Sequence, residues 1–342
     1  MKLPTSVRLG NSGLKISRLI VGCMSYGLKE WQDWVIEDKE EVFKLLKHCY
    51  DNGLRTYDTA DVYSYGESER LLGEFLKHYN IDRETVVILT KIFSPVKRGF
   101  KPFGETQKPS PMEVLELENQ RGLSRKHILH GVQQSVERLG TYIDVLQVHR
   151  LDRETPMEEI MRALNDVVES GQVRYLGAST MRATEFVELQ FIAEKHGWFK
   201  FISSQSCYNL LYREDEKELI PFAQRHQIGL IPWSPLARGS LTKPVGGKSN
   251  RSVSDAGMMV VGEVKDDSEI QIISRVQEVA GNRSVSMAMV STAWVLKKGL
   301  NPILGLSSIE RIDEAIKALE LELTDDEVKY LEEPYQTKKL IF

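Results

Sequence analysis

Short apolar segments alternate along the chain with segments whose apolar residues recur every three or four positions. The apolar segments are rich in β-branched residues and nearly continuous, which is typical of parallel strands buried on both faces. Eight strands are predicted, at Arg18–Gly22, Leu54–Asp58, Val86–Thr90, Ile143–His149, Val173–Ala178, Phe201–Gln205, Ile228–Trp233 and Pro302–Gly305.

The segments between these strands have the period of amphipathic helices. Residues 42–50 and 71–79 each carry an apolar stripe, and Ser124 and Thr155 are expected to cap two further helices, with Pro156 in a first turn. Strand followed by helix, repeated eight times, predicts a single (β/α)8 barrel, or TIM barrel, domain over residues 1–342. The alternative is an open doubly wound sheet, but the Gly-x-Gly-x-x-Gly turn typical of that fold is absent from the sequence.

Three segments interrupt the repeat. Residues 1–17 are predicted to form a small β-hairpin ahead of the barrel, because Gly10-Asn-Ser-Gly13 has the composition of a turn. Residues 92–124 follow the third strand and residues 234–265 follow the seventh. Long loops in a compact domain are usually lids or binding loops, so both are expected to border a site.

Composition narrows the classes of function. The 342 residues are 41% hydrophobic and 27% charged, as in ordinary globular proteins, and the net charge of −4 gives no field that would attract nucleic acid. Three cysteines without a CxxC pair argue against a disulfide framework, and the seven histidines form no metal-binding pattern. With no signal peptide and no apolar run of membrane-spanning length, we expect a cytoplasmic protein without a membrane partner or a metal.

Reactive side chains gather at the predicted strand ends. Asp58 ends the second strand, Lys91 follows the third, His149 ends the fourth, and Tyr63 lies five residues after Asp58. In TIM barrels the carboxyl ends of the strands carry the active site, so these four side chains are expected to meet.

These four residue types suit the reduction of a carbonyl group, which needs a hydride at carbon and a proton at oxygen. The phenol of Tyr63 is a candidate proton donor, since a neighbouring lysine ammonium favours the phenolate that remains. Asp58 would hold Lys91 in place, and His149 would orient the substrate oxygen. A buried structural ion pair between Asp58 and Lys91 is the simpler alternative.

Several motifs together resemble the aldo-keto reductase family, in particular its fungal aryl-alcohol-dehydrogenase-like branch, which is also similar to the potassium-channel β-subunit group. The resemblance covers residues 6 to 335. It rests on Tyr57-Asp-Thr-Ala-Asp-Val-Tyr63, Gly66-Glu-Ser-Glu69, Thr90-Lys91, Val148-His149-Arg150, Gly177-Ala-Ser179, Gln205 with Tyr208-Asn209, and Trp233-Ser-Pro-Leu236.

The resemblance implies a nicotinamide cofactor and a role for each matching residue. Tyr63 would be the general acid, with Asp58, Lys91 and His149 beside it. The cofactor would be bound by Cys23 and Met24 near Asp58, by Ser179, Thr180 and Gln205 at the carboxamide, by Trp233 on the nicotinamide ring, by Ser234, Pro235, Leu236 and Arg238 along the pyrophosphate, and by Gly305, Ser307, Arg311 and Glu314 at the adenosine.

Arg311 bears on the choice of cofactor. An arginine at the start of the last barrel helix can pair with a 2′-phosphate, which favours NADPH over NADH. The sequence departs from the family pattern in three places: Trp233 replaces a common Tyr, and Thr180 and Ala315 each replace a common Asn.

The leading hypothesis is therefore an NADPH-dependent reductase of small aldehydes or ketones, acting as a monomer or weak oligomer. The substrate pocket is expected to be lined by Tyr26, Trp31 and Trp34, by residues 92–124 and by the segment after the seventh strand. Trp31, Trp34 and Phe93 favour aryl or apolar substrates. One alternative is a redox-sensing subunit that binds NADP(H) and turns over slowly. Another is a lyase that forms a Schiff base on Lys91.

Overall fold

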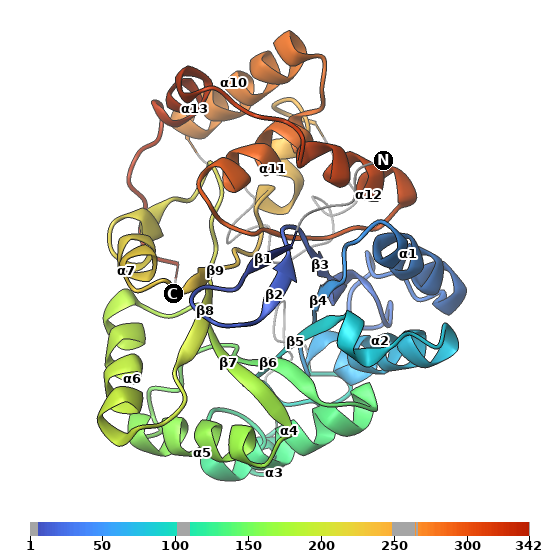
Figure 1. The fold of residues 1–342 in the computed structure, drawn as a ribbon, viewed down its shortest axis with the longest axis vertical. Helices are drawn as coiled ribbons and strands as arrows, with labels where there is room; N and C mark the ends of the chain where they lie inside the picture. Colours follow the sequence, from blue (N-terminus) through green and yellow to red (C-terminus); the bar gives the residue numbers. More distant parts are fainter. Residues whose placement is uncertain (1–5, 101–109, 248–263, 265, 342) are drawn as a thin grey trace.

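Eight parallel strands form the centre of the molecule (Figure 1). The computed structural model describes residues 6–100, 110–247, 264 and 266–341. The strands are β3 (Ile20–Gly22), β4 (Thr56–Asp58), β5 (Val87–Ile92), β6 (Ile143–Val148), β7 (Val173–Ser179), β8 (Phe201–Gln205), β9 (Gly229–Leu230) and β10 (Ile303–Leu304). Their order in the sheet is β10-β3-β4-β5-β6-β7-β8-β9, so chain neighbours are also spatial neighbours.

The sheet closes on itself between its last two strands. The backbone N–H groups of Asn301 and Ile303 donate to the carbonyl oxygens of Leu230 and Pro232, each over 3.0 Å. These bonds join β9 to β10, which in turn pairs with β3. The predicted (β/α)8 barrel is confirmed, and the open-sheet alternative is excluded.

The last two strands are shorter than the sequence predicts. Regular pairing in the predicted segments Ile228–Trp233 and Pro302–Gly305 covers only two residues each. Pro232 and Pro302 lack the N–H group that a longer ladder needs, although their carbonyl oxygens still accept bonds from the neighbouring strands.

Helices surround the barrel, as Figure 1 shows. Those that alternate with the strands are α1 (Lys39–Asp51), α2 (Glu67–His78), α4 (Arg125–Leu139), α5 (Met157–Glu169), α6 (Ala183–His196), α7 (Leu219–Arg225), α11 (Met287–Lys297) and α12 (Ile309–Ala318). Among the described residues, three more helices stand outside this alternation: α3 (Pro111–Leu117), α10 (Asp267–Arg283) and α13 (Asp325–Glu332). Short 3-10 turns include η1 (Cys23–Ser25), η2 (Tyr63–Gly66), η3 (Arg83–Thr85), η4 (Glu214–Glu216) and η5 (Ala237–Thr242).

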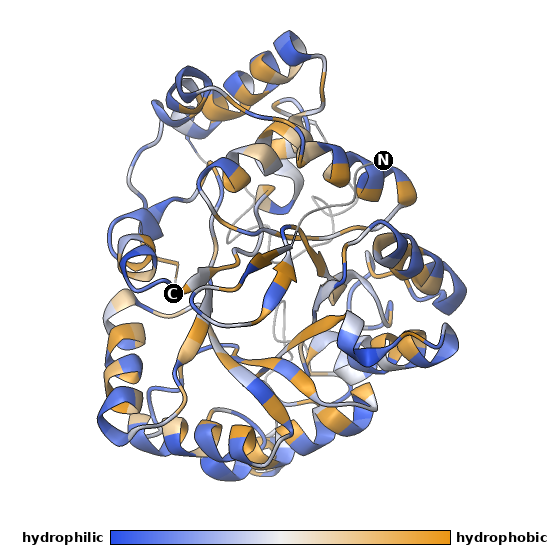
Figure 2. Ribbon diagram, in the orientation of Figure 1, coloured by the Kyte–Doolittle hydropathy of each residue, from blue (hydrophilic) through white to orange (hydrophobic). Residues whose placement is uncertain are grey.

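The helices bury their apolar stripes against the strands, and their polar faces point outward (Figure 2). The predicted cap of α4 is confirmed, because the Ser124 side chain accepts the N–H of His127. The predicted cap of α5 at Thr155 is wrong. The Thr155 hydroxyl donates to Asp152 instead, and α5 begins after Pro156 without a side-chain cap.

The predicted N-terminal hairpin is present and covers one end of the barrel. Strand β1 (Ser6–Arg8) pairs antiparallel with β2 (Lys15–Ser17). The N–H of Asn11 in its turn donates to the Gln227 carbonyl, and the N–H of Ser17 donates to the Thr56 hydroxyl. Because Gln227 and Thr56 lie at the amino ends of β9 and β4, the hairpin closes that end and leaves the carboxyl end open.

Candidate active site

A cavity of about 890 Å³ lies at the carboxyl end of the barrel. That volume is within the range typical of pockets that bind cofactors and small molecules. Its wall includes most of the residues predicted from the sequence, namely Met24, Asp58, Tyr63, His149, Ser179, Gln205, Trp233, Ser234, Pro235, Leu236, Arg238, Gly305, Ser307, Arg311 and Glu314.

Lys91 stands directly behind this wall, on β5, and is almost completely buried. Its ammonium nitrogen lies 2.6 Å from Asp58 Oδ2, 2.8 Å from the Thr59 carbonyl oxygen and 3.3 Å from the Tyr63 hydroxyl. An ammonium group has three protons, so all three are used. A Schiff base on Lys91 would require breaking this buried set of bonds, and Lys91 does not line the cavity.

The bond from Lys91 also decides how Tyr63 is oriented. Because the ammonium can only donate, the Tyr63 oxygen must accept, and the phenolic proton remains available to another partner. Tyr63 is 7% exposed and lines the cavity, so its proton is accessible from the cavity.

Burial and neighbouring charges set the protonation states of Tyr63 and His149. Burial raises the pKa of Tyr63, while nearby Lys91 lowers it, and the net result is a neutral phenol at neutral pH. Burial, Arg150 and Lys91 together hold the pKa of His149 well below its usual range, so its imidazole is uncharged. The rings of Tyr63 and His149 meet edge to face, with their centroids 6.0 Å apart.

Arg150 is a further cation at this wall. Its guanidinium donates to the carbonyl oxygen of His149 over 2.8 Å, and burial lowers its pKa to about 10. It remains charged at neutral pH and adds positive potential beside Tyr63 and His149.

An unusual backbone path presents Tyr63. Ser64 and Tyr65 both adopt left-handed conformations, with φ of 49° and 57°. The Ser64 hydroxyl accepts the N–H of Leu28, which ties this turn to the loop after β3. That loop supplies Trp31, whose ring packs 5.9 Å from the Tyr63 ring and fixes its position.

Asp58 is held by more than its ion pair. Its second oxygen, Oδ1, accepts the side-chain amides of Gln147 over 3.0 Å and Gln205 over 2.8 Å. Gln147 was not predicted from the sequence, although it precedes His149 by two residues and therefore shares its face of β6.

Ser179 and Trp233 form the next part of the wall, and Thr180 lies next to both. The indole N–H of Trp233 donates to the Thr180 hydroxyl over 3.1 Å, and the Ser179 and Thr180 hydroxyls are also 3.1 Å apart. Thr180 does not line the cavity itself. Its place is behind Trp233, where it orients the indole.

The segment after β9 curves along the cavity in a series of left-handed residues. Ser234, Ala237 and Arg238 have φ of 51°, 45° and 52°, and Gly239 has φ of 102°. The Asn209 side chain donates to the Ser234 carbonyl over 2.9 Å and supports this path.

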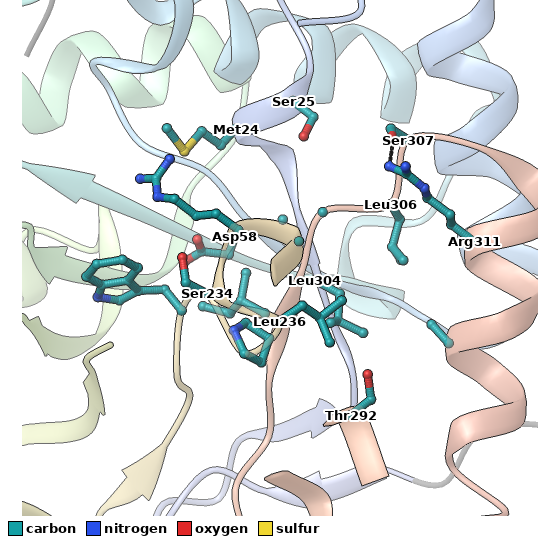
Figure 3. Close-up of a pocket in the computed structure, with 18 of the residues that line it drawn as sticks. Met24, Ser25, Asp58, Ser234, Leu236, Thr292, Leu304, Leu306, Ser307 and Arg311 are labelled. Carbon is teal, nitrogen blue, oxygen red and sulfur yellow. Dashed lines mark hydrogen bonds between the residues drawn. The ribbon is translucent and has the colours of Figure 1, made fainter. Parts of the chain in front are cut away.

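Arg311 and Ser307 lie at the far end of the cavity from Ser234 and Asp58 (Figure 3). The Arg311 guanidinium donates to the Ser307 hydroxyl over 2.6 Å, and Arg311 is exposed. It lies in the first turn of α12, whose N-cap Ser308 accepts the Arg311 N–H.

Some predicted residues lie elsewhere. Cys23 does not line the cavity but is buried in the main core, with its thiol directed to the Val21 carbonyl. Tyr26 and Trp31 are also fully buried, and of the expected aromatic wall Trp34 alone contacts the cavity. These three residues support the site from behind because the loop after β3 folds back onto the barrel. The expectation for residues 92–124 is not met in their described part, because none of residues 92–100 and 110–124 lines the cavity.

A nicotinamide dinucleotide fits the donor set of this cavity. Ser179 and Gln205 offer polar groups beside the aromatic Trp233, and a cation at the distant end suits a phosphate. Among the described residues no group of three His, Cys, Asp or Glu could hold a metal ion. Nor does the described part of the chain contain a helix of the length and apolar character needed to cross a membrane.

The chain belongs to the aldo/keto reductase family, whose model matches residues 18–336. It is therefore an oxidoreductase of a family that uses a nicotinamide cofactor.

Three relatives from fungi match almost the whole chain. "Putative aryl-alcohol dehydrogenase AAD16" of Saccharomyces cerevisiae is 61% identical over 99% of both chains. "Putative aryl-alcohol dehydrogenase C977.14c" of Schizosaccharomyces pombe is 55% identical over 96% of this chain and 94% of its own. Versiconal hemiacetal acetate reductase of Aspergillus parasiticus is 51% identical over 97% of both.

Proposed function

We propose that this protein reduces aldehydes or ketones to alcohols with NADPH, and that Tyr63 supplies the proton. The observation that carries the proposal is the saturation of the Lys91 ammonium by Asp58, Thr59 and Tyr63. Because Lys91 donates to the Tyr63 oxygen, the phenol keeps its own proton free to donate into the cavity, with the Lys91 ammonium beside its oxygen.

The bound cofactor would supply a hydride to the carbonyl carbon. Tyr63 would donate its proton to the carbonyl oxygen as negative charge develops there. The uncharged His149 imidazole would hydrogen-bond the same oxygen and orient it. The phenolate left on Tyr63 would be stabilised by Lys91, 3.3 Å away, and Asp58 would keep that ammonium in place.

Each part of the cavity would hold one part of NADPH. Ser179 and Gln205 would bind the carboxamide, with Thr180 acting through Trp233, which would stack on the nicotinamide ring near Met24. The pyrophosphate would follow Ser234, Pro235, Leu236 and Arg238. The adenosine would lie at Gly305, Ser307, Arg311 and Glu314, with the 2′-phosphate on Arg311.

The substrate end of the cavity favours aryl or apolar carbonyl compounds. Trp34 lies on the cavity wall, and its ring packs against Trp31, which in turn packs against Tyr63. The relatives from Saccharomyces cerevisiae and Schizosaccharomyces pombe are each named "Putative aryl-alcohol dehydrogenase", which supports aryl substrates. In the part of the chain that the structure describes, no feature favours the slow-turnover redox sensor over an enzyme.

The test is NADPH oxidation against a panel of aromatic and aliphatic aldehydes, ketones and dicarbonyls, repeated with NADH. We expect turnover with aromatic aldehydes and a higher kcat/KM with NADPH than with NADH. Tight NADPH binding without steady-state turnover on any member of the panel would instead support the sensor, and an absence of binding would refute the proposal.

A further inference from the structure

Three polar side chains meet inside the barrel where TIM barrels usually have branched apolar residues. Alternate strands of such a barrel contribute side chains to one interior layer. Asp58, Gln147 and Gln205 come from β4, β6 and β8, which are the second, fourth and sixth barrel strands. All three are buried, with exposures of 3%, 0% and 2%. A buried polar layer costs free energy unless its groups are hydrogen-bonded.

The hydrogen bonds of this layer fix the orientation of both amides. Asp58 Oδ1 belongs to a carboxylate and can only accept, so the nitrogens of Gln147 and Gln205 must face it. Gln205 Nε2 also donates to Gln147 Oε1 over 2.7 Å. Both protons of the Gln205 amide are thereby used within the layer, one by Asp58 and one by Gln147.

The remaining polar atom of Gln205 is its carbonyl oxygen, Oε1. Gln205 lines the cavity, whereas Gln147 lies wholly behind it. Gln205 therefore presents a hydrogen-bond acceptor to the cavity and no donor. An acceptor selects an N–H group, and the carboxamide of nicotinamide carries two of them.

We propose that Gln147 is a positioning residue that holds Gln205 so that its Oε1 selects the amide N–H of the cofactor's carboxamide. The inference rests on the proposed function, because it concerns how the NADPH of that proposal is recognised. Without Gln147, one N–H of Gln205 has no acceptor in the layer. The Gln205 amide would then turn to share that N–H with the cofactor, and the preference for an N–H partner would weaken.

A pair of cofactors that differ at this group can test the proposal. The 3-acetylpyridine analogue of NADP+ keeps the carbonyl of the carboxamide but has a methyl group in place of the NH2. An unmet buried acceptor weakens binding, so the wild-type protein is expected to bind NADP+ about tenfold more tightly than the analogue. Dissociation constants for both are measured by titration calorimetry, without a turnover assay.

The main variant is Gln147→Met, which keeps the volume of the side chain and removes its polar atoms. We expect the ratio of the two dissociation constants to fall to about threefold or less, since half or more of the one-bond preference is lost. If Gln147 only fills space in the layer, both constants change by the same factor and the ratio stays at the wild-type value. That result, or a wild-type ratio near one, would overturn the proposal.

Two further variants control the interpretation. Gln205→Met is expected to abolish the preference, and adding Gln147→Met to it should change the ratio no further. Gln147→Glu provides a rescue, because a carboxyl group buried against Asp58 is expected to be protonated and can then make both hydrogen bonds of the original amide. It should retain the wild-type ratio. If Gln147→Met does not fold, Gln147→Leu replaces it as the variant without polar atoms, with the same fall in the ratio expected and a wild-type ratio overturning the proposal.

The same titrations separate an error in the proposed cofactor from an error in the role of Gln147. If the proposed cofactor is wrong, the wild-type protein binds neither compound. If the role of Gln147 alone is wrong, both bind and the ratio is indifferent to the Gln147 variants.

Discussion

At the scale of single residues, the buried ion pair of Asp58 and Lys91 persists because every polar atom of it has a partner. Burial alone lowers the pKa of Lys91, but Asp58 and Tyr63 outweigh burial and raise it, so the ammonium remains charged. A buried ion pair adds little stability by itself, and breaking one by removing a partner is strongly destabilising. The pair is therefore better explained by the need to hold Tyr63 than by stability.

Arg311 makes the choice between NADPH and NADH testable at one residue. Replacing it by leucine removes a charge-assisted contact worth about 1–3 kcal/mol with the 2′-phosphate, so kcat/KM for NADPH should fall about 5- to 100-fold. NADH lacks that phosphate and serves as the internal control, with a change of less than about twofold expected. Equal losses with both cofactors would show that Arg311 does not contact the phosphate.

At the scale of elements, periodicity predicted the strands and helices well, while boundaries and caps depended on local chemistry. All eight predicted strands are present, but Pro232 and Pro302 shorten the last two. The cap at Thr155 failed because α5 begins at Met157, one residue later than predicted, so Pro156 occupies the N-cap position. The residue at which a helix begins, and the partner of a capping side chain, depend on local contacts that the hydrophobic pattern of the sequence does not reveal.

Close packing of α2 against α4 depends on Gly73. A Cβ at this position would lie 2.3 Å from the Leu139 carbonyl oxygen, which is backbone and cannot move alone. Gly73→Ala should therefore lower the free energy of unfolding by about 1–3 kcal/mol, despite alanine's better helix propensity. The matched control is Gly281→Ala in α10, where no atom lies within 4 Å.

That control is expected to raise the free energy of unfolding by up to about 1 kcal/mol. Denaturant unfolding of both variants measures the difference. If Gly73→Ala is as stabilising as Gly281→Ala, the two helices are not as closely packed as described.

The first turn of α13 gives a prediction that depends on pH. Glu327 pairs with Arg283 and completes a capping box with Thr324, and these contacts lower its pKa to about 2. A lowered folded-state pKa adds stability that is present above the unfolded value of about 4.3 and is lost as the pH falls through the folded value. Because both side chains are partly exposed, Glu327→Gln should cost about 0.5–1 kcal/mol at pH 7.

The cost of Glu327→Gln should shrink as the pH falls from 5 towards 2, which thermal unfolding at several pH values would follow. A cost that is independent of pH would assign the role of Glu327 to packing rather than to its charge.

At the scale of the whole molecule, the sequence revealed the barrel and most of the cavity wall because both follow from the repeat. Asp58, Tyr63 and His149 lie at or just after strand ends, and strand ends can be located from the pattern. The sequence did not reveal Gln147, because a polar residue within an apolar strand acquires meaning only when Asp58 and Gln205 are seen around it. Cys23 was misplaced for the opposite reason: it follows a strand end, but its side chain turns into the core.

The central claim, that Tyr63 is the proton donor for carbonyl reduction, is tested most directly by single-turnover kinetics of Tyr63→Phe. Phenylalanine keeps the ring that packs on Trp31 and His149 and removes only the hydroxyl. The account predicts that hydride transfer from bound NADPH to an aromatic aldehyde slows by about 10²–10⁴-fold. It also predicts that the dissociation constant of NADPH changes by less than about threefold, since the hydroxyl contributes at most about one hydrogen bond's worth to cofactor binding. Hydride transfer at the wild-type rate in Tyr63→Phe would contradict it.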